Sequence, residues 1–124
     1  MGNPFCHIEL MTGDVSKARE FYSKLFDWKY QEMAMPEGPY TIIDTGSKEA
    51  GGGMMMKPEP GCPTAWMAYV LVADVAATLA KVKGAGGKVC MEKTEIPGVG
   101  WFGMIVDPTG ANLGVFEANE KHCK

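Results

Sequence analysis

One order of predicted elements, strand–helix–strand–strand–strand, runs through the chain twice. A strand at 5–11 leads into a helix at 15–26, and a strand at 66–72 leads into a second helix. An Asp-Val pair begins both helices, first as Asp14-Val15 and again 60 positions later as Asp74-Val75. Aspartate at this position accepts hydrogen bonds from the first amide groups of a helix. A repeat of this kind predicts a fold built from two copies of one βαβββ unit.

The length of 124 residues suits one domain with one hydrophobic core. Within it, the repeat predicts a first module at about 4–57 and a second at about 64–118. The Pro- and Gly-rich segment 58–63 is expected to link the modules, and the polar segment 119–124 is expected to form a tail. We therefore expect a single domain made of two modules.

Charge and hydropathy exclude several classes of function. The formal net charge is −3, whereas nucleic-acid binding needs a basic surface. Strongly apolar stretches are only a few residues long, so no segment is expected to span a membrane. The N-terminal residues lack the basic and apolar regions of a secretory signal, and the cysteines show no CxxC spacing. We expect a cytoplasmic protein with reduced thiols and with no nucleic-acid or membrane partner.

Two motifs in the sequence resemble those of one superfamily. The first is a D-x-x-x-A-x-x-F-Y pattern, which consists of Asp14, Ala18, Phe21 and Tyr22. The second is a D-P-x-G turn at 107–110, ahead of the final predicted strand. Over about 5–117 the chain therefore resembles the glyoxalase, bleomycin-resistance and extradiol-dioxygenase proteins, which form the vicinal oxygen chelate superfamily.

This resemblance implies an α+β fold. Its two tandem βαβββ modules would form a curved mixed sheet around a concave cleft, with the helices on the convex side. Members of the superfamily act on or bind small molecules, and many single-domain members form dimers. The resemblance therefore also implies a small-molecule ligand and a homodimer, and the chain looks like a divergent glyoxalase-like member.

Polar residues in the predicted first and last strands mark a candidate site. Alternate side chains of a strand share a face, so His7 and Glu9 lie opposite the apolar residues that should face the helix. In the last strand Glu117 shares a face with Val115. The resemblance implies that these faces look into the cleft. Glu117 and Glu9 are therefore the candidate catalytic carboxylates.

The resemblance also implies metal ligands in the first and last strands of each module, at His7, Met54, Met67 and Glu117. An imidazole and a carboxylate suit a divalent ion, whereas a thioether is a poor ligand for hard or borderline metals. Glu9 is the candidate third ligand, because catalytic metal sites usually have three protein ligands. The expected cofactor is one divalent ion, Zn, Ni, Fe or Mn, bound by His7, Glu117 and Glu9. Alternatively, His7 is a strand histidine that hydrogen-bonds one of the two glutamates.

An apolar pocket is expected beside these residues. Its predicted lining consists of Met54, Met67, Tyr69 and Trp101. Two functions remain open. One is a metal-dependent lyase, isomerase or dioxygenase-type enzyme, in which the metal polarises a carbonyl oxygen and a carboxylate moves a proton. The other is a metal-free protein that binds and sequesters an apolar small molecule, as antibiotic-resistance members of the superfamily do.

Overall fold

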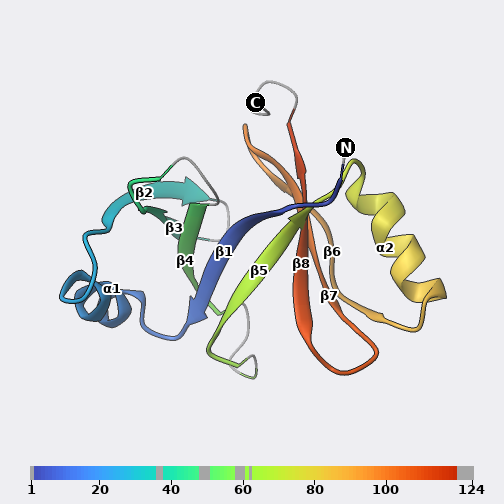
Figure 1. Cartoon of the computed structure of the whole chain (residues 1–124), viewed down its shortest axis with the longest axis horizontal. Helices are drawn as coiled ribbons and strands as arrows, with labels where there is room; N and C mark the ends of the chain where they lie inside the picture. Colours follow the sequence, from blue (N-terminus) through green and yellow to red (C-terminus); the bar gives the residue numbers. More distant parts are fainter. Residues whose placement is uncertain (1, 36–37, 48–50, 58–60, 62, 120–124) are drawn as a thin grey trace. The chain divides into compact units, whose positions relative to one another are not determined.

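The doubled order of elements is present in the folded chain (Figure 1). This computed structural model describes residues 2–35, 38–47, 51–57, 61 and 63–119. The predicted linker at 58–63 and the predicted tail at 119–124 therefore lie largely outside the described residues. Among the described helices, none is long and apolar enough to cross a membrane.

Each half of the chain contributes one helix and a set of strands. The first half consists of β1 (Phe5–Thr12), α1 (Val15–Ser23), β2 (Lys29–Met35), β3 (Gly38–Asp44) and β4 (Gly51–Met56). The second half consists of β5 (Ala65–Leu71), α2 (Val75–Gly84), β6 (Lys88–Ile96), β7 (Gly100–Val106) and β8 (Asn112–Ala118). Both halves are βαβββ modules, so the predicted α+β class is confirmed.

Two compact units make up the chain, and their boundaries fall within β1 and β5. The N-terminal unit is His7–Met67, and the C-terminal unit is Met1–Cys6 together with Ala68–Lys124. The segment just ahead of β1 belongs to the C-terminal unit, and hydrogen bonds tie it to the end of β5. The Leu71 amide donates to the Pro4 carbonyl oxygen over 2.8 Å, and Asn3 Nδ2 donates to the Leu71 carbonyl oxygen over 2.9 Å.

The strands of the N-terminal unit follow the order β2-β3-β4-β1. β1 pairs with β4 in parallel, while β3 pairs antiparallel with both β2 and β4. α1 covers one face of this sheet, over a buried cluster of Leu10, Ile43 and Met54. Asp14 caps α1 as the sequence predicts, since its Oδ1 accepts a hydrogen bond from the Lys17 amide over 2.9 Å.

The C-terminal unit repeats this topology with the order β5-β8-β7-β6. β5 pairs with β8 in parallel, and β7 pairs antiparallel with β8 and β6. α2 lies along this sheet over a buried cluster of Val75, Leu79 and Val115 (Figure 1). Asp74 caps α2, because its Oδ1 accepts from the Ala77 amide over 3.1 Å. In both units, therefore, the first and last strands of the module lie side by side.

The predicted D-P-x-G turn connects β7 to β8. Asp107 Oδ1 accepts from the Thr109 hydroxyl over 2.7 Å, from the Thr109 amide over 2.8 Å and from the Ala111 amide over 3.1 Å. The bond from the Thr109 hydroxyl, followed by those from the backbone, lowers the pKa of the Asp107 carboxyl. The carboxylate thereby stabilises the turn that sets the register of β8 against β7.

Candidate functional site

A chain of three hydrogen-bonded side chains occupies the face of the N-terminal unit away from α1. Tyr40 in β3 donates its hydroxyl proton to Glu9 Oε1 over 2.9 Å, and the same hydroxyl lies 2.7 Å from His7 Nε2. The next residue in β1, Leu10, packs beneath α1, so His7 and Glu9 point to the opposite face. The structure thus brings two of the predicted site residues together and adds Tyr40 between them.

Burial governs the protonation of this His7–Tyr40–Glu9 chain. Glu9 is only 4% exposed, and a buried carboxylate is costly unless it is hydrogen-bonded. Burial, followed by the charge of Glu9 and the hydrogen bond to it, raises the pKa of Tyr40, so the hydroxyl keeps its proton. Burial lowers the pKa of His7, which favours the neutral imidazole. In the His7–Tyr40–Glu9 chain, the Tyr40 hydroxyl therefore donates its proton and lies between the Glu9 carboxylate and the neutral His7 imidazole.

Gly53 in β4 provides the space that Tyr40 occupies. It stands opposite Glu9 in the parallel pair of β1 and β4, and a Cβ at this position would overlap the Tyr40 hydroxyl. Sequence reasoning missed Tyr40, because its link to Glu9 depends on the register of three strands. The glycine run at 51–53 was the available signal, since glycine within a strand often marks the close approach of another group.

The equivalent strand positions of the C-terminal unit are aromatic. Tyr69 pairs in register with Gly114, as Glu9 pairs with Gly53. The Tyr69 ring occupies the space beside Gly114 and meets Phe102 edge-on, with ring centroids 6.2 Å apart. One module therefore carries an acid–phenol pair where the other carries two aromatic rings.

Glu117 lies on the helix-covered face of β8 and not on the opposite face that the sequence predicts. Val115, two residues earlier on the same face, packs against Val75 and Leu79 of α2. Glu117 Oε1 accepts a hydrogen bond from the Val75 amide over 3.1 Å. That amide belongs to the first turn of α2, where amides lack acceptors within the helix and the helix dipole favours a carboxylate. Glu117 therefore helps to cap α2.

The predicted pocket residues fall into two groups. Met54 is fully buried in the cluster beneath α1, and Trp101 packs on the cluster beneath α2. The Lys93 ammonium lies 5.1 Å from the Trp101 ring centroid, within the range of a cation–π interaction. Met67 and Tyr69 are each 4% exposed. The structure thus places Met54 and Trp101 on the faces that meet the helices, because alternation along a strand does not tell which face a helix covers.

The sequence matches the profile of the Glyoxalase/Bleomycin resistance protein/Dioxygenase superfamily over residues 5–115. The chain belongs to this superfamily. The match extends from β1 into β8 and so includes both modules. It confirms the membership that the two sequence motifs indicated.

Two named relatives match most of this chain. "Putative glyoxylase CFP32" of Mycobacterium tuberculosis is 35% identical over 116 residues, which cover 90% of this chain and 44% of that protein. "Anthracycline biosynthesis protein DnrV" of Streptomyces peucetius is 26% identical over 122 residues, which cover 87% of this chain and 44% of that protein. The chain thus spans less than half the length of these relatives.

Solved structures share the superfamily fold at low sequence identity. Hypothetical protein BH1468 from Bacillus halodurans C-125 matches with a TM-score of 0.73 and 12% identity, over 97% of both chains. Methylmalonyl-CoA epimerase from Mycobacterium tuberculosis matches with a TM-score of 0.68 and 14% identity, over 94% of this chain and 89% of that one. At these identities the likeness shows the fold alone.

The described side chains do not fit the divalent metal that the superfamily implies. Within the described parts of the chain, no three His, Cys, Asp or Glu side chains gather as a group that would hold a metal. In the N-terminal unit, His7 Nε2 and Glu9 Oε1 both contact the hydroxyl of Tyr40, whose raised pKa keeps it protonated and a poor ligand. Catalytic sites usually supply three ligands, so the described donor set does not fit a divalent ion.

Glu117→Ala tests the capping role of this side chain. Removing the acceptor for the Val75 amide is expected to lower the free energy of unfolding by about 1 kcal/mol, the usual cost of a lost cap. Urea unfolding measures the change, with the slope m expected to stay constant. Glu95→Ala, at an exposed position of β6, is the matched control and should change stability by less than about 0.5 kcal/mol. Equal losses in the two variants would contradict the capping role.

Proposed function

We propose that this protein is a glyoxalase-like small-molecule enzyme that transfers a proton with its His7–Tyr40–Glu9 chain. The observation that supports this proposal is the hydrogen-bonded path from an imidazole to a buried carboxylate through one hydroxyl. Groups with a perturbed pKa cluster at functional sites, and the pKa values of both His7 and Tyr40 are shifted here. Membership of the superfamily supports a small molecule as the substrate.

The directions of the hydrogen bonds assign a role to each group. Tyr40 donates to Glu9, so its oxygen accepts the Nε2 proton of His7. This tautomer leaves Nδ1 as the imidazole nitrogen that accepts a proton, and the lowered pKa of His7 keeps the ring neutral beforehand. When His7 takes a proton, the Glu9 carboxylate stabilises the imidazolium through Tyr40.

The reaction that suits such a base is proton abstraction from a carbon next to a carbonyl group. His7 forms an N–H bond as the C–H bond of the substrate breaks, and the electron pair of that bond passes to the carbonyl oxygen as an enolate. Return of the proton to the same carbon or to a neighbouring atom regenerates neutral His7. The reaction class is therefore isomerisation or epimerisation, with no net change in oxidation state.

A second candidate function is the binding of an apolar small molecule without a reaction. The observation that favours it is the pair of aromatic rings in the C-terminal unit, where Tyr69 packs beside Gly114 and meets Phe102 edge-on. Aromatic rings offer large contact areas to apolar ligands. In this case the protein would sequester its ligand.

Deuterium exchange at a carbon acid distinguishes the two candidates. The probes are the hemithioacetal of methylglyoxal with glutathione, and methylmalonyl-CoA, which a solved methylmalonyl-CoA epimerase with the same fold binds. In D₂O with EDTA present, the wild-type protein should accelerate incorporation of deuterium next to the carbonyl group. His7→Gln should lower that rate by about 100-fold or more, the usual contribution of a general base. Mass spectrometry measures the incorporated deuterium.

The control is Glu20→Gln, at an exposed position of α1, which should leave the exchange rate unchanged. Exchange that occurs only after Zn²⁺, Ni²⁺, Fe²⁺ or Mn²⁺ is added would contradict proton transfer without a metal and would favour the metal-dependent reaction. Saturable binding of a probe, followed by tryptophan fluorescence and without any exchange, would favour the second candidate.

A further inference from the structure

Methionine side chains lie on the same face of the N-terminal sheet as the His7–Tyr40–Glu9 chain. Leu10 of β1 and Met54 of β4 pack in the cluster beneath α1. The next residues along these strands, Met11 and Met55, therefore point to the opposite face. They pair in register, so their side chains stand next to each other across the two strands.

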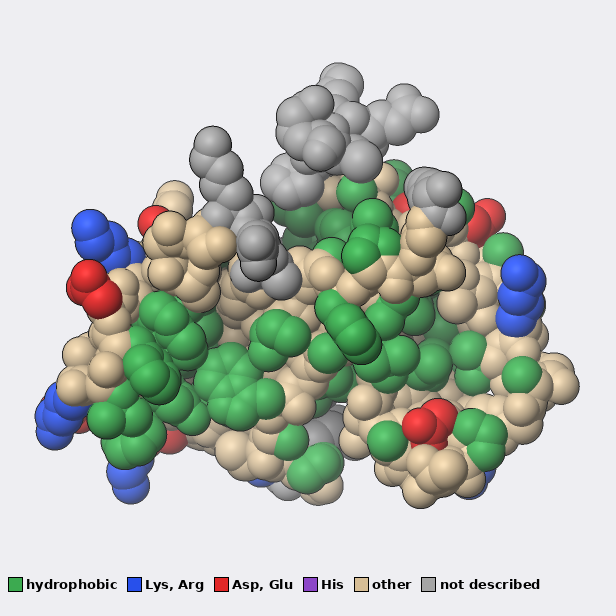
Figure 2. All heavy atoms as spheres, in the orientation of Figure 1, with side chains coloured by type: hydrophobic (Ala, Val, Ile, Leu, Met, Phe, Trp, Pro, Cys, Tyr) green, Lys and Arg blue, Asp and Glu red, His purple; other side chains and the backbone are tan. Residues whose placement is uncertain are grey.

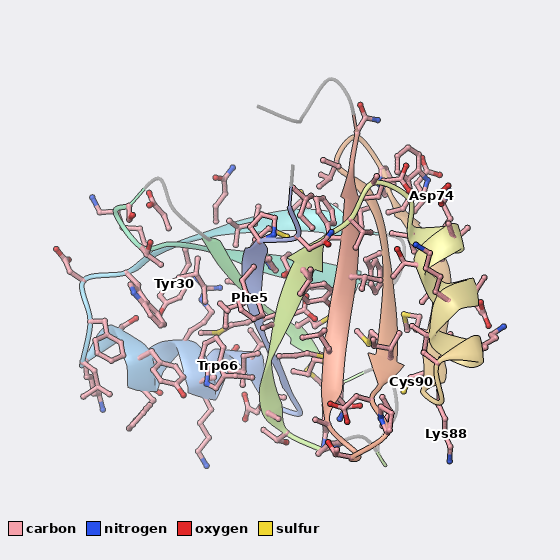
Figure 3. All side chains as sticks on the ribbon, turned by 45° about the vertical axis from the view of Figure 1, so that its right-hand side comes forward. Phe5, Tyr30, Trp66, Asp74, Lys88 and Cys90 are labelled. Atoms are coloured by element: carbon pink, nitrogen blue, oxygen red, sulfur yellow. The ribbon has the colours of Figure 1, made fainter. Side chains whose placement is uncertain are left out.

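Met33 places a further thioether on this face, in β2. Tyr30 of the same strand packs against the cluster beneath α1 (Figure 3). Met33, which comes three residues later, consequently points to the opposite face. It pairs in register with Tyr40 of β3, whose hydroxyl bonds to Glu9. We call Met11, Met33 and Met55 the methionine surface.

Part of the methionine surface is accessible to a ligand. Met33 and Met55 are partly exposed, whereas Met11 is only 7% exposed. Methionine side chains are apolar and flexible, so they adapt to ligands of different shape. An alkyl group that covers Met33 and Met55 removes apolar area from water, which favours binding.

The other end of the same face is charged. His7, Asp44 and Lys29 lie at the end of β1, β3 and β2 that is remote from the methionine surface, and Lys29 pairs in register with Asp44. A cavity of about 160 Å³ at this end is lined by Asp27, Lys29, Asp44 and Gly46. Charged groups lose hydration when an apolar group covers them, which is unfavourable. An apolar substituent is therefore favoured at the methionine end of the face.

A separate apolar surface lies over α1, where Phe21 and Leu25 are each 55% exposed (Figure 2). α1 covers the face of the sheet opposite to the His7–Tyr40–Glu9 chain. A molecule held by Phe21 or Leu25 is thus on the wrong side of the sheet to react with His7. Of the two surfaces, the methionine surface is the one that shares a face with the reacting groups.

We infer that the methionine surface binds an apolar substituent of the substrate beside the His7–Tyr40–Glu9 chain. This inference rests on the proposed function and names its substrate class, a carbonyl compound with an alkyl or aryl group on one side. Glu9 and Met11 lie about 7 Å apart along β1, which is two residues of rise, and a hexyl group spans this distance. Binding of the substituent would hold the acidic carbon of the substrate in place next to His7.

Two ketones with alkyl groups of different length test the inference. Methyl hexyl ketone should bind at least about 10-fold more tightly than methyl ethyl ketone, because its longer chain removes more apolar area from water. NMR titration of the full chain with isotope-labelled methionine methyl groups measures both dissociation constants, and the signals of Met33 and Met55 should shift. In the double variant Met33→Gln, Met55→Gln the preference should fall below about 3-fold, since glutamine has a similar length but a polar end.

Two single variants serve as controls, with far-UV circular dichroism to confirm that every variant is folded. Met56→Gln changes the next methionine of β4, which is 53% exposed and points to the other face, and it should keep the preference. Phe21→Gln, on the surface over α1, should keep it as well. A preference that the double variant retains, or that Phe21→Gln abolishes, would overturn the inference.

Deuterium exchange next to the ketone carbonyl, measured on the same proteins in D₂O, separates this inference from the proposed function. Tighter binding of methyl hexyl ketone without exchange would support the methionine surface as a binding site and contradict proton transfer by His7. Exchange with equal dissociation constants for the two ketones would support proton transfer and overturn the methionine surface. A protein that binds neither ketone would also overturn the inference.

Discussion

Tyr40→Phe is expected to lower the free energy of unfolding by about 2 kcal/mol, since hydrogen bonds to charged groups contribute more than neutral ones. The change removes one oxygen atom and keeps the ring. Glu9, which is 4% exposed, loses the donor at 2.9 Å, and His7 loses its contact at 2.7 Å. Urea unfolding followed by circular dichroism measures the difference, with an unchanged slope m.

Tyr30→Phe provides the matched control in the same unit. The Tyr30 hydroxyl is buried and, among the described residues, has no hydrogen-bond partner. Its removal breaks no hydrogen bond, so stability should change by less than about 0.5 kcal/mol or increase. If both variants lost the same amount, the Tyr40 hydroxyl would contribute nothing to the stability of the unit.

Gly53→Ala is expected to destabilise the chain by about 3 kcal/mol, at the upper end of the range for an overpacked interior. The added Cβ would overlap the hydroxyl and the adjacent ring carbons of Tyr40, which must then move away from Glu9. Thermal and urea unfolding measure the loss. Because the displaced hydroxyl is the link between His7 and Glu9, the exchange activity should fall together with stability.

Gly51→Ala is the control for this substitution. Gly51 lies on the same strand and the same face as Gly53, but a Cβ at Gly51 would meet no atom within 4 Å. The change should alter stability by less than about 0.5 kcal/mol. On a Tyr40→Ala background, Gly53→Ala should cost far less than it does alone. If the stability losses of Tyr40→Ala and Gly53→Ala were additive in the double variant, the cost of Gly53→Ala would not come from overlap with the Tyr40 side chain.

The fold could be predicted because its strongest signals are local. Asp14 and Asp74 each cap a helix within their own turn, and Asp107 bonds to residues that follow it directly. Such signals depend only on neighbours in the sequence, so they identify elements without knowledge of tertiary packing. Their repetition at a near-constant offset then indicated the two βαβββ modules.

The candidate site could be predicted only where a strand has one polar and one apolar face. In β1, His7 and Glu9 alternate with apolar residues, so the face that meets α1 could be identified. In β8 both faces are apolar, with Val115 on one and Phe116 on the other, and alternation did not show which one packs against α2. For that reason the position of Glu117 beside the first turn of α2 could not be predicted from the pattern.

The parallel pairing of first and last strands has a consequence for how each unit assembles. His7 pairs with Gly51, and Tyr69 pairs with Gly114, so each pair closes a loop that contains the rest of its module. Closing such a loop lowers the conformational entropy of the polypeptide before the hydrogen bonds between the two strands can form. This early entropy cost slows folding. During synthesis, β1 must wait for β4 to emerge from the ribosome before it gains this partner strand. β1, which carries His7 and Glu9, is thus the first strand of the N-terminal unit to be synthesised, but it pairs with β4 only after the rest of the module has been synthesised.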